Sequence, residues 1–174
     1  MASRDRATAL LREGARGVAG GAVGTGAMAL AARIRREAYA RRQGITVPEI
    51  DEILDYDDSE HVVIAASRLL HAVVGWAPRT ERGRHALFWF VHWGYGSFVG
   101  AGHLVLQRVL GREPLPGVVF LVATQTMALG LFPVLGDTPP PWRWRGDLLR
   151  TSFVQHGIYA GGVAAANPLT ARAV

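Results

Sequence analysis

Histidine and tyrosine side chains recur along one apolar stretch of the sequence, where they could carry protons or bind a metal. His92, Tyr95 and His103 lie in the segment 86–106, and the two histidines are separated by close to three helical turns. Both would share one helix face, about 16 Å apart along the axis. They cannot bind one metal ion together, and the chain has no HxxxH pair, ExxH pair or cysteine. We therefore predict no metal and no cofactor, and either a proton path or interhelical hydrogen bonds.

Further polar residues lie in the later apolar segments. Pro133 and Asp137 stand near and just after the end of the third segment, and His156 lies inside the fourth. A proline removes one backbone donor and leaves a carbonyl that must find a partner within a membrane. Ionisable residues in a membrane span usually face the interior of the helix bundle. We expect the segment 133–142, which includes Pro133 and Asp137, to form the rim of a pocket together with His92 and His156.

Sequence motifs of common catalytic sites are missing. The chain has no GK[ST] phosphate loop and no GxSxG nucleophile elbow, and its glycine-rich stretches 21–26 and 94–100 do not fit GxGxxG. The acidic run 49–60 lacks the glycine and the terminal glutamate of a calcium loop. We therefore expect no enzymatic activity.

Charge is distributed very unevenly along the chain. Nineteen arginines and no lysine stand against 14 acidic residues, and the resulting charge of +5 would by itself suggest nucleic-acid binding. Charged residues are nevertheless absent from four windows that take up nearly half of the sequence: 17–32, 85–107, 114–136 and 151–171. A membrane-spanning helix needs about 20 mostly apolar residues in a row. Because many of the arginines flank these windows, we predict a lipid bilayer and no nucleic acid as the partner.

The four windows predict the architecture. We expect an all-α, polytopic membrane protein in which residues 1–174 form a single membrane domain. Four transmembrane helices are expected at about 15–34, 86–107, 116–136 and 148–166. The polar loop 35–85 is expected to hold one amphipathic helix, because Arg68 in its apolar stretch disfavours a full span. The fourth helix is expected to end at Asn167 and Pro168.

The first apolar segment has an alternative interpretation as a signal peptide. It has a basic start, an apolar middle and an Ala-Tyr-Ala sequence at 38–40 that resembles a cleavage site. Three arginines between the apolar run and that site, Arg33, Arg35 and Arg36, disfavour cleavage. We expect instead a helix that continues toward Arg42.

Arginine counts bear on the orientation in the membrane. Four spans place both termini on one side with 7 arginines, and the long loop lies on the other side with 12. The positive-inside rule then favours a cytoplasmic long loop. The first span is flanked by similar numbers of arginines on both sides, so it contributes little to this preference.

Glycines spaced four residues apart recur in three of the four predicted spans. The pairs are Gly17/Gly21, Gly20/Gly24, Gly96/Gly100 and Gly157/Gly161. Each pair creates a smooth groove on one helix face, which allows close approach of a second helix in lipid. The spacing predicts a tightly packed bundle, and it leaves open whether some grooves serve a homo-oligomer.

Several short motifs, taken in order, are similar to those of a known family. They are His-Trp-Gly-Tyr-Gly at 92–96, Leu-Phe-Pro-Val-Leu-Gly at 131–136, Thr-Pro-Pro at 138–140 and Gln-His-Gly at 155–157. In this order the chain resembles the YagU-like family of uncharacterised bacterial inner-membrane proteins. The resemblance implies a multi-pass protein of the bacterial inner (plasma) membrane. It carries no established catalytic or binding residues, and it does not extend to the acidic run.

Two functions from different classes remain. The first is a structural or partner-binding helical bundle, with the acidic run 49–60 and the amphipathic helix 60–77 as docking surfaces for a membrane protein partner. The alternative is a small proton-linked or solute-conducting protein that uses His92, His103 and His156. Convergence of these side chains on one buried cavity would favour the alternative.

Overall fold

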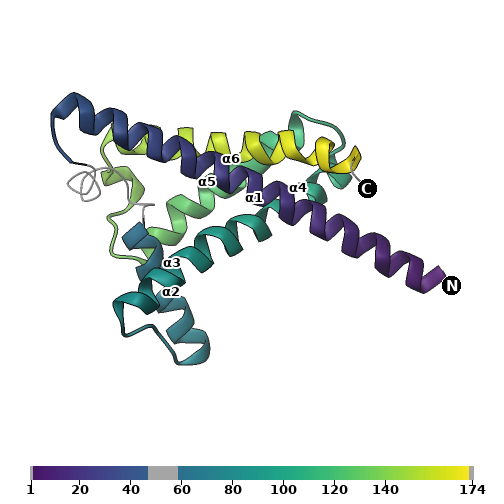
Figure 1. Cartoon of the computed structure of the whole chain (residues 1–174), viewed down its shortest axis with the longest axis horizontal. Helices are drawn as coiled ribbons and strands as arrows, with labels where there is room; N and C mark the ends of the chain where they lie inside the picture. Colours follow the sequence, from purple (N-terminus) through teal and green to yellow (C-terminus); the bar gives the residue numbers. More distant parts are fainter. Residues whose placement is uncertain (1, 47–58, 173–174) are drawn as a thin grey trace.

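The computed structural model describes the backbone of residues 2–46 and 59–172. Within these ranges the chain holds no strand and has a helical content of 86%, which confirms the all-α prediction. The elements in chain order are α1 (Ala2–Gln43), α2 (Ser59–Val74), α3 (Glu81–Phe90), the π-helical turn η2 (Val91–Tyr95), α4 (Gly96–Leu110), α5 (Leu115–Leu135), the 3-10 turn η3 (Pro141–Arg143) and α6 (Gly146–Arg172) (Figure 1). Contacts between helices therefore position every candidate functional side chain.

The longest helix, α1, packs against α4 through glycine (Figure 1). A Cβ atom added to Gly17 would stand 2.6 Å from the Cα atom of Ala101. Gly21 lies directly against Gly100 and against the backbone of Gly96. The predicted pairs Gly17/Gly21 and Gly96/Gly100 thus meet in one contact, where the absence of side chains lets the two backbones approach closely.

A second glycine face of α1 packs against α6. A Cβ atom on Gly24 would stand 2.7 Å from the carbonyl oxygen of Tyr159, and one on Gly162 would stand 3.0 Å from the Cα atom of Gly24. The predicted pair Gly157/Gly161 takes no part in this contact, because a Cβ atom on either glycine would meet nothing within 4 Å. The helix presents Gly162 instead, which lies three residues after Tyr159 on the same face.

The elements α3, η2 and α4 follow one another without a break, so the chain is helical from Glu81 to Leu110. Thr80 caps the start, since its hydroxyl accepts a hydrogen bond from the Gly83 N–H at 3.1 Å. The π-helical turn at Val91–Tyr95 falls inside the predicted second span. Such turns insert one extra residue into a helix and often occur at functional sites.

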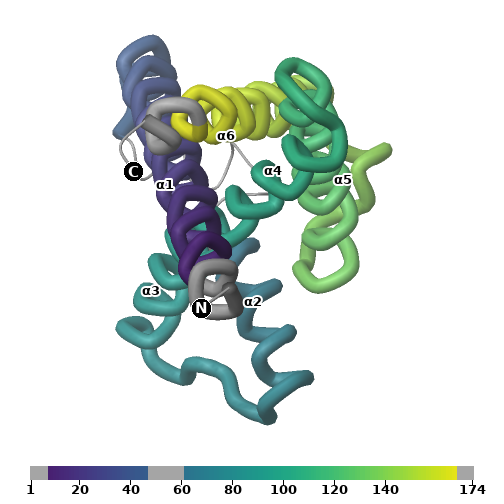
Figure 2. Tube along the Cα trace, turned by 90° about the vertical axis from the view of Figure 1, so that its right-hand side faces the viewer, coloured from purple at the N-terminus to yellow at the C-terminus, as the bar shows by residue number. Residues whose placement is uncertain are grey.

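The helices α5 and α6 complete the bundle, and Figure 2 shows α6 lying between α1 and α5. The centre of the bundle holds a cluster of buried residues, Phe120, Tyr159, Ala160 and Val163. The Gln125 side-chain amide donates a hydrogen bond to the Ser152 hydroxyl at 3.0 Å, and both groups are buried. Apolar packing and one buried hydrogen bond therefore join α5 to α6.

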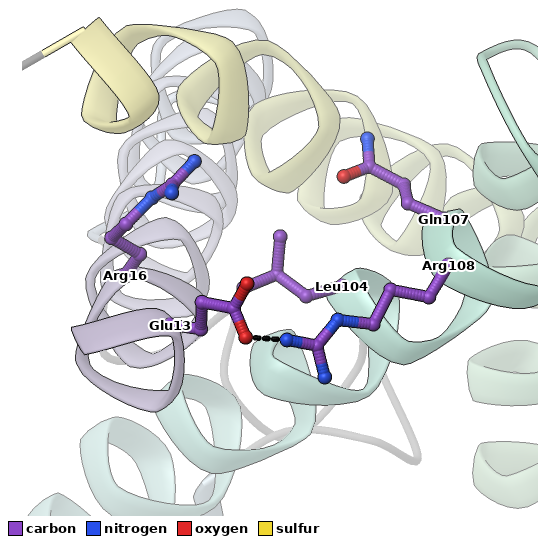
Figure 3. A pocket seen from close by; sticks show the side chains of 5 residues that line it. All are labelled: Glu13, Arg16, Leu104, Gln107 and Arg108. Atoms are coloured by element: carbon purple, nitrogen blue, oxygen red, sulfur yellow. Dashed lines mark ion pairs between the residues drawn. The ribbon is translucent and has the colours of Figure 1, made fainter. Parts of the chain in front are cut away.

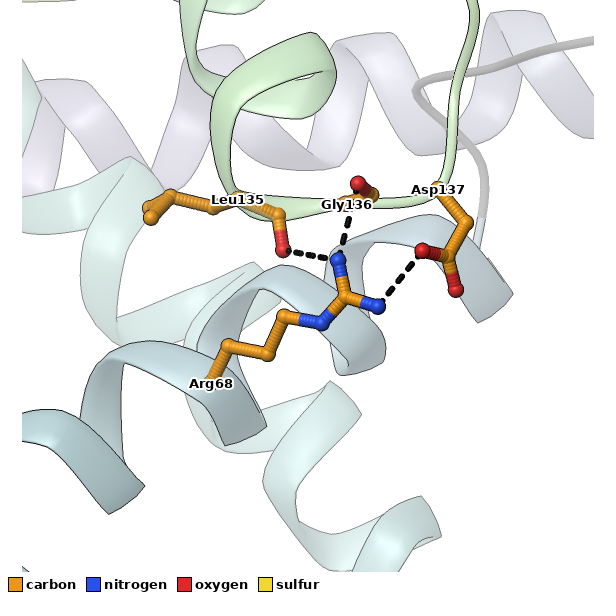
Figure 4. Close-up of polar contacts among 4 residues, drawn as sticks. All are labelled: Arg68, Leu135, Gly136 and Asp137. Carbon is orange, nitrogen blue, oxygen red and sulfur yellow. Dashed lines mark hydrogen bonds and ion pairs between the residues drawn. The ribbon is translucent and has the colours of Figure 1, made fainter.

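The predicted amphipathic helix is α2, which packs against the end of α5. Its Ala65 is buried with Ala128 and Phe132 of α5. Arg68 donates hydrogen bonds to the carbonyl oxygens of Leu135 and Gly136, and it forms a 2.5 Å ion pair with Asp137 (Figure 4). The last carbonyls of a helix lack intrahelical partners and carry partial negative charge. Arg68, whose charge disfavours a membrane span in this segment, therefore caps the C-terminal end of α5.

Among the residues that the structure describes, two helices are long and apolar enough to cross a membrane, Thr8–Gln43 within α1 and Leu115–Leu135, which is α5. Length and composition of this kind also occur in core helices of soluble proteins and in signal sequences. An all-helical bundle with two such helices is therefore established, and four transmembrane helices are not. The predicted segment 86–107 is divided by the π-helical turn, and the predicted segment 148–166 is less apolar.

The end of α1 agrees with the prediction, and the end of α6 does not. The helix α1 continues to Gln43, as expected from the sequence. The fourth helix does not end at Asn167 and Pro168 but runs to Arg172. A proline removes one hydrogen-bond donor from a helix, and the loss of a single bond does not by itself end the helix. The acidic run 49–60 lies almost entirely outside the described residues.

Candidate functional site

His103 on α4 lies at the meeting point of three segments. Its side chain is completely buried, with 0% of its surface exposed. The Nδ1 atom lies 2.6 Å from the Nδ2 atom of Asn167 on α6. The Nε2 atom lies 2.8 Å from the Oε1 atom of Glu113, in the turn between α4 and α5. One imidazole thus contacts polar groups from two other parts of the chain.

Glu113 is held in place at the start of α5. Its Oε2 atom accepts a hydrogen bond from the Gly117 N–H at 2.9 Å, and its Oε1 atom accepts one from the Gln107 amide at 3.0 Å. Backbone N–H groups at a helix N-terminus lack intrahelical partners, and the helix dipole there favours a negative charge. The Glu113 side chain is 34% exposed, so water can reach the carboxylate.

The protonation of His103 follows from its two neighbours. The Asn167 amide nitrogen can only donate, so Nδ1 accepts and carries no proton in the neutral ring. The proton then sits on Nε2, beside the Glu113 carboxylate, in a close contact whose alignment is poorer than that of a regular hydrogen bond. The arrangement can fix three helices in register, and it can also share a proton between imidazole and carboxylate.

Aromatic rings enclose the imidazole on its inner side. The ring centroids of His103 and Phe120 are 5.3 Å apart in an edge-on arrangement, and those of Phe120 and Tyr159 are 5.7 Å apart. The Tyr159 hydroxyl donates a hydrogen bond to the Gly96 carbonyl at 2.5 Å. Such rings exclude water and lower the local dielectric, which strengthens the polar contacts of His103.

A cavity of about 200 Å³ lies beside this cluster (Figure 3). It lies between α1 and α4 and is lined by Glu13, Arg16, Leu104, Gln107 and Arg108. Arg108 forms an ion pair with Glu13 across the two helices. Gln107 lines the cavity and also donates to Glu113, so a continuous series of polar groups leads from the cavity toward the buried imidazole.

His92 and Tyr95 lie in the π-helical turn, away from the His103 cluster. The His92 ring stacks on Phe88 with a centroid distance of 5.4 Å and meets Trp93 edge-on at 5.8 Å. The Tyr95 hydroxyl contacts the sulfur atom of Met127 at 2.8 Å. Tyr95 is 44% exposed, which places it at the outer side of the bundle.

Pro133, Asp137 and His156 each have different surroundings. Pro133 is inside α5, and Asp137 is an exposed residue paired with Arg68. The Nδ1 atom of His156 lies 2.9 Å from the Ser152 carbonyl oxygen of its own helix. None of the six predicted candidates lines the cavity between α1 and α4, or a second cavity whose described lining residues belong to α1 and α6. The pocket rim at His92, Asp137 and His156 stays a prediction.

Three members of the His103 cluster were not singled out in the sequence. Glu113 directly precedes the window 114–136, Gln107 is the last residue of the window 85–107, and Asn167 directly follows the predicted span 148–166. Each is a polar residue at the end of an apolar window or predicted span, and that position was the available signal. Whether these side chains meet depends on how α4 and α6 are rotated about their axes, and the sequence alone does not give this rotation.

Comparisons with known proteins provide no further assignment. No protein-family model matches the chain, and neither a curated protein nor a solved structure matches it significantly. In the part of the chain that the structure describes, no group of three or more histidine, aspartate or glutamate side chains is placed to hold a metal ion. The geometry of the helices and of the His103 cluster therefore carries the functional argument.

Proposed function

We propose that the protein is an integral membrane protein with a structural or partner-binding role, in which four helical segments cross the bilayer. The observation that carries this proposal is the surface of α5. The most apolar window of this helix is only 28% buried within the protein. Its exposed residues include Val118, Val122 and Val134. Large apolar surfaces are costly in water, and lipid chains would cover them.

The positions of the chain ends and turns support four crossings. The N-terminus, the turn between α4 and α5, and the C-terminal part of α6 lie at one end of the bundle (Figure 1). The end of α1, the helix α2 and the turn η3 lie at the other end (Figure 1). The segments α1, α3 to α4, α5 and α6 thus alternate in direction. Their glycine contacts are of the kind that holds helices together in lipid, where the hydrophobic effect gives helices little reason to associate.

Cysteine accessibility tests this topology directly, because the natural chain contains no cysteine. Single variants Arg112→Cys and Trp142→Cys lie in the turns at opposite ends of the bundle, and both positions are exposed. In sealed vesicles, an impermeant thiol reagent should label one variant from outside and the other only after the vesicles are opened. Labelling of both from the same side, or release of the protein by alkaline carbonate, would overturn the proposal.

A partner-binding role is supported by the outer face of α2. Leu69, Val73 and Val74 are 50%, 72% and 62% exposed, and Trp76 follows them at 57%. Cross-linking in native membranes should yield a defined product, either a homo-oligomer or a complex with one membrane protein. The product should be lost in the variant Leu69→Ser/Val73→Ser and retained in the variant Val118→Ser/Val122→Ser on α5. Identical products from all three proteins would contradict this role.

The proton-linked alternative is favoured by one observation, the contact between the buried His103 and the partly exposed Glu113. If this pair carries protons, proteoliposomes containing the protein should show a proton flux that His103→Gln and Glu113→Gln both abolish. The variant His85→Gln serves as the control, because His85 bonds Trp89 within α3. Absence of flux in the natural protein would reject the alternative and leave the structural role.

The cellular location is proposed from the YagU-like resemblance of the motifs at 92–96, 131–140 and 155–157. We place the protein in the inner membrane of a bacterium, with the long loop and α2 on the cytoplasmic side because that side has more arginines. A fluorescent protein fused after residue 174 should then lie outside the cytoplasm. Because it would be exported unfolded, we expect it to show no fluorescence. Bright fluorescence from this fusion would reverse the orientation.

A further inference from the structure

The cavity between α1 and α4 carries more positive than negative charge. Two guanidinium groups, those of Arg16 and Arg108, are among its described lining residues, and Glu13 is the one carboxylate among them. Glu13 pairs with Arg108. Within the part of the chain that the structure describes, Arg16 forms neither an ion pair nor a hydrogen bond. The charge of Arg16 is therefore available to a ligand in this cavity.

The Arg16 side chain also lacks a hydrogen-bond acceptor. Its Nε atom is buried, and no described residue accepts a hydrogen bond from it. A buried donor without an acceptor is costly, and such groups in native proteins usually have a bound partner. The Nε–H and one terminal N–H of a guanidinium together form a fork that matches two oxygens of one anion. An oxyanion would satisfy both the donor and the charge, whereas water would satisfy only the donor.

The other lining residues limit what the cavity can hold. In Figure 3 the Arg16 guanidinium and the Gln107 amide lie on either side of the apolar Leu104. Gln107 donates to Glu113, which also contacts Gly117 and His103, so this second carboxylate is engaged elsewhere. The volume of about 200 Å³ is smaller than the roughly 300–1,000 Å³ of pockets for drug-sized ligands. The space suits one small anionic group.

The position of the cavity along the helices indicates which anion to expect. Arg16 directly precedes the charge-free window 17–32, and Arg108 directly follows the window 85–107. Both belong to the end of the bundle that holds the N-terminus and the turn between α4 and α5 (Figure 1). In the proposed topology this is the level where hydrocarbon gives way to headgroups, and lipid phosphates lie there.

We propose that this cavity binds one phosphate group through the fork of Arg16. The Nε–H and one terminal N–H of Arg16 donate to two phosphate oxygens, and Leu104 packs below the group. The phosphate comes either from a lipid headgroup or from free phosphate in solution. The site goes beyond the proposed structural role, and only its lipid source requires a bilayer.

Two binding measurements on the delipidated protein in mild detergent test the site and separate the sources. Isothermal titration calorimetry uses inorganic phosphate as the probe. Native mass spectrometry compares phosphatidylglycerol with diacylglycerol of the same acyl chains, which lacks the phosphate. We expect saturable binding of one phosphate group per chain in at least one of the two measurements. Absence of phosphate-dependent binding in both would overturn the proposal.

Variants of opposite expected effect locate the site. Arg16→Gln should weaken binding at least about tenfold, because the charged fork is lost. Glu13→Gln should tighten binding severalfold, because it removes a negative charge and releases Arg108. A gain of affinity cannot result from unfolding, so this second variant keeps the test decisive if Arg16→Gln is unstable.

Matched controls change the same charges outside the cavity. Arg112→Gln removes an exposed arginine at the same end of the bundle, and Glu37→Gln releases Arg33 from an exposed ion pair. Neither Arg112 nor Glu37 lines the cavity, so the affinity should stay unchanged in both variants. Equal effects in the controls and in the cavity variants would show attraction by net charge alone and would overturn the proposal.

Failure of this inference is distinguishable from failure of the proposed function. A protein that resists alkaline carbonate and shows the expected cysteine labelling, but binds neither probe, is a membrane protein without this site. A protein that carbonate releases, but that binds inorganic phosphate through Arg16, contradicts the membrane role alone.

Discussion

A buried imidazole needs partners for both of its ring nitrogens, and His103 has them on two other segments of the chain. Asn167 supplies a donor to one nitrogen, and Glu113 supplies a carboxylate beside the other. If one partner is removed, the remaining polar groups stay buried and lose a hydrogen bond, which is costly in a medium of low dielectric. The stability of the bundle should therefore depend on individual atoms of this cluster.

Replacement of Asn167 tests this dependence. Asn167→Ala leaves Nδ1 of the completely buried His103 without its donor, and the expected loss of stability is about 1–3 kcal/mol. Thermal unfolding in detergent, followed by circular dichroism, measures the effect. Gln43→Ala, at the exposed end of α1, is the control. Equal melting temperatures for the two variants would show that the contact with Asn167 contributes nothing.

At the level of elements, two glycine faces of α1 determine how the helices meet. One face packs against α4, and the other packs against α6. A Cβ atom added at Gly17, Gly21 or Gly24 would stand less than 3.0 Å from a backbone atom of the neighbouring helix, so a new methyl group has no room to enter. Glycines elsewhere on the same helices are open to their surroundings.

Two adjacent glycines of α6 allow a matched test. A Cβ atom on Gly162 would stand 3.0 Å from Gly24 Cα, and one on Gly161 would meet nothing within 4 Å. Overpacking at this position should cost about 1–3 kcal/mol of the free energy of unfolding. Gly162→Val should therefore lower the melting temperature. Gly161→Val should leave it nearly unchanged or raise it, since valine removes the flexibility of glycine. Similar melting temperatures for both variants would contradict the packing.

The contact of α2 with the end of α5 predicts a local effect. Arg68→Gln removes the ion pair with Asp137 and the bonds to two helix-terminal carbonyls. The Arg68 side chain is 48% exposed, so the contact contributes only about 1 kcal/mol. Hydrogen exchange in α2 should accelerate roughly fivefold. The exchange rate of the other helices should stay unchanged. In the control variant Arg79→Gln, the exchange rate should stay unchanged throughout the protein. A uniform acceleration in Arg68→Gln would show global destabilisation instead.

At the scale of the whole molecule, the exposed apolar residues indicate which parts of its surface contact lipid in the proposed topology. Phe90, Phe98 and Val109 on the α3 to α4 segment are about as exposed as Val134 on α5, each near three quarters. Tryptophan is enriched where a membrane meets water. Trp142, which is 82% exposed and directly follows three prolines, stands at such a boundary in the proposed topology.

Depth-dependent quenching checks this placement. A variant that keeps Trp142 as its only tryptophan should be quenched more strongly by a spin label near the lipid headgroup than by one at the end of the acyl chain. A variant that keeps only Trp93, inside the second apolar segment, should show more quenching from the deeper label. The same profile for both variants would contradict the proposed depth.

The sequence by itself determined which segments are helical, whereas α1 begins before and α6 ends after the bounds that the sequence predicted. The exclusion of charge from the four windows is a property of consecutive residues, and it predicted α1, α5, α6 and the α3 to α4 segment. The glycine spacing also predicted that Gly17/Gly21 and Gly96/Gly100 form packing faces, but it did not predict that these two faces meet each other. Two residues that are four positions apart lie on the same face of a helix, whatever the rest of the fold is.

Only the tertiary structure decided which polar residues meet. In the structure, His103 meets Glu113 and Asn167, and Gly162 rather than Gly161 contacts α1. These outcomes depend on the rotation of each helix about its own axis. Rotation is set by the combined packing of all neighbouring helices, so no single segment of the sequence contains it.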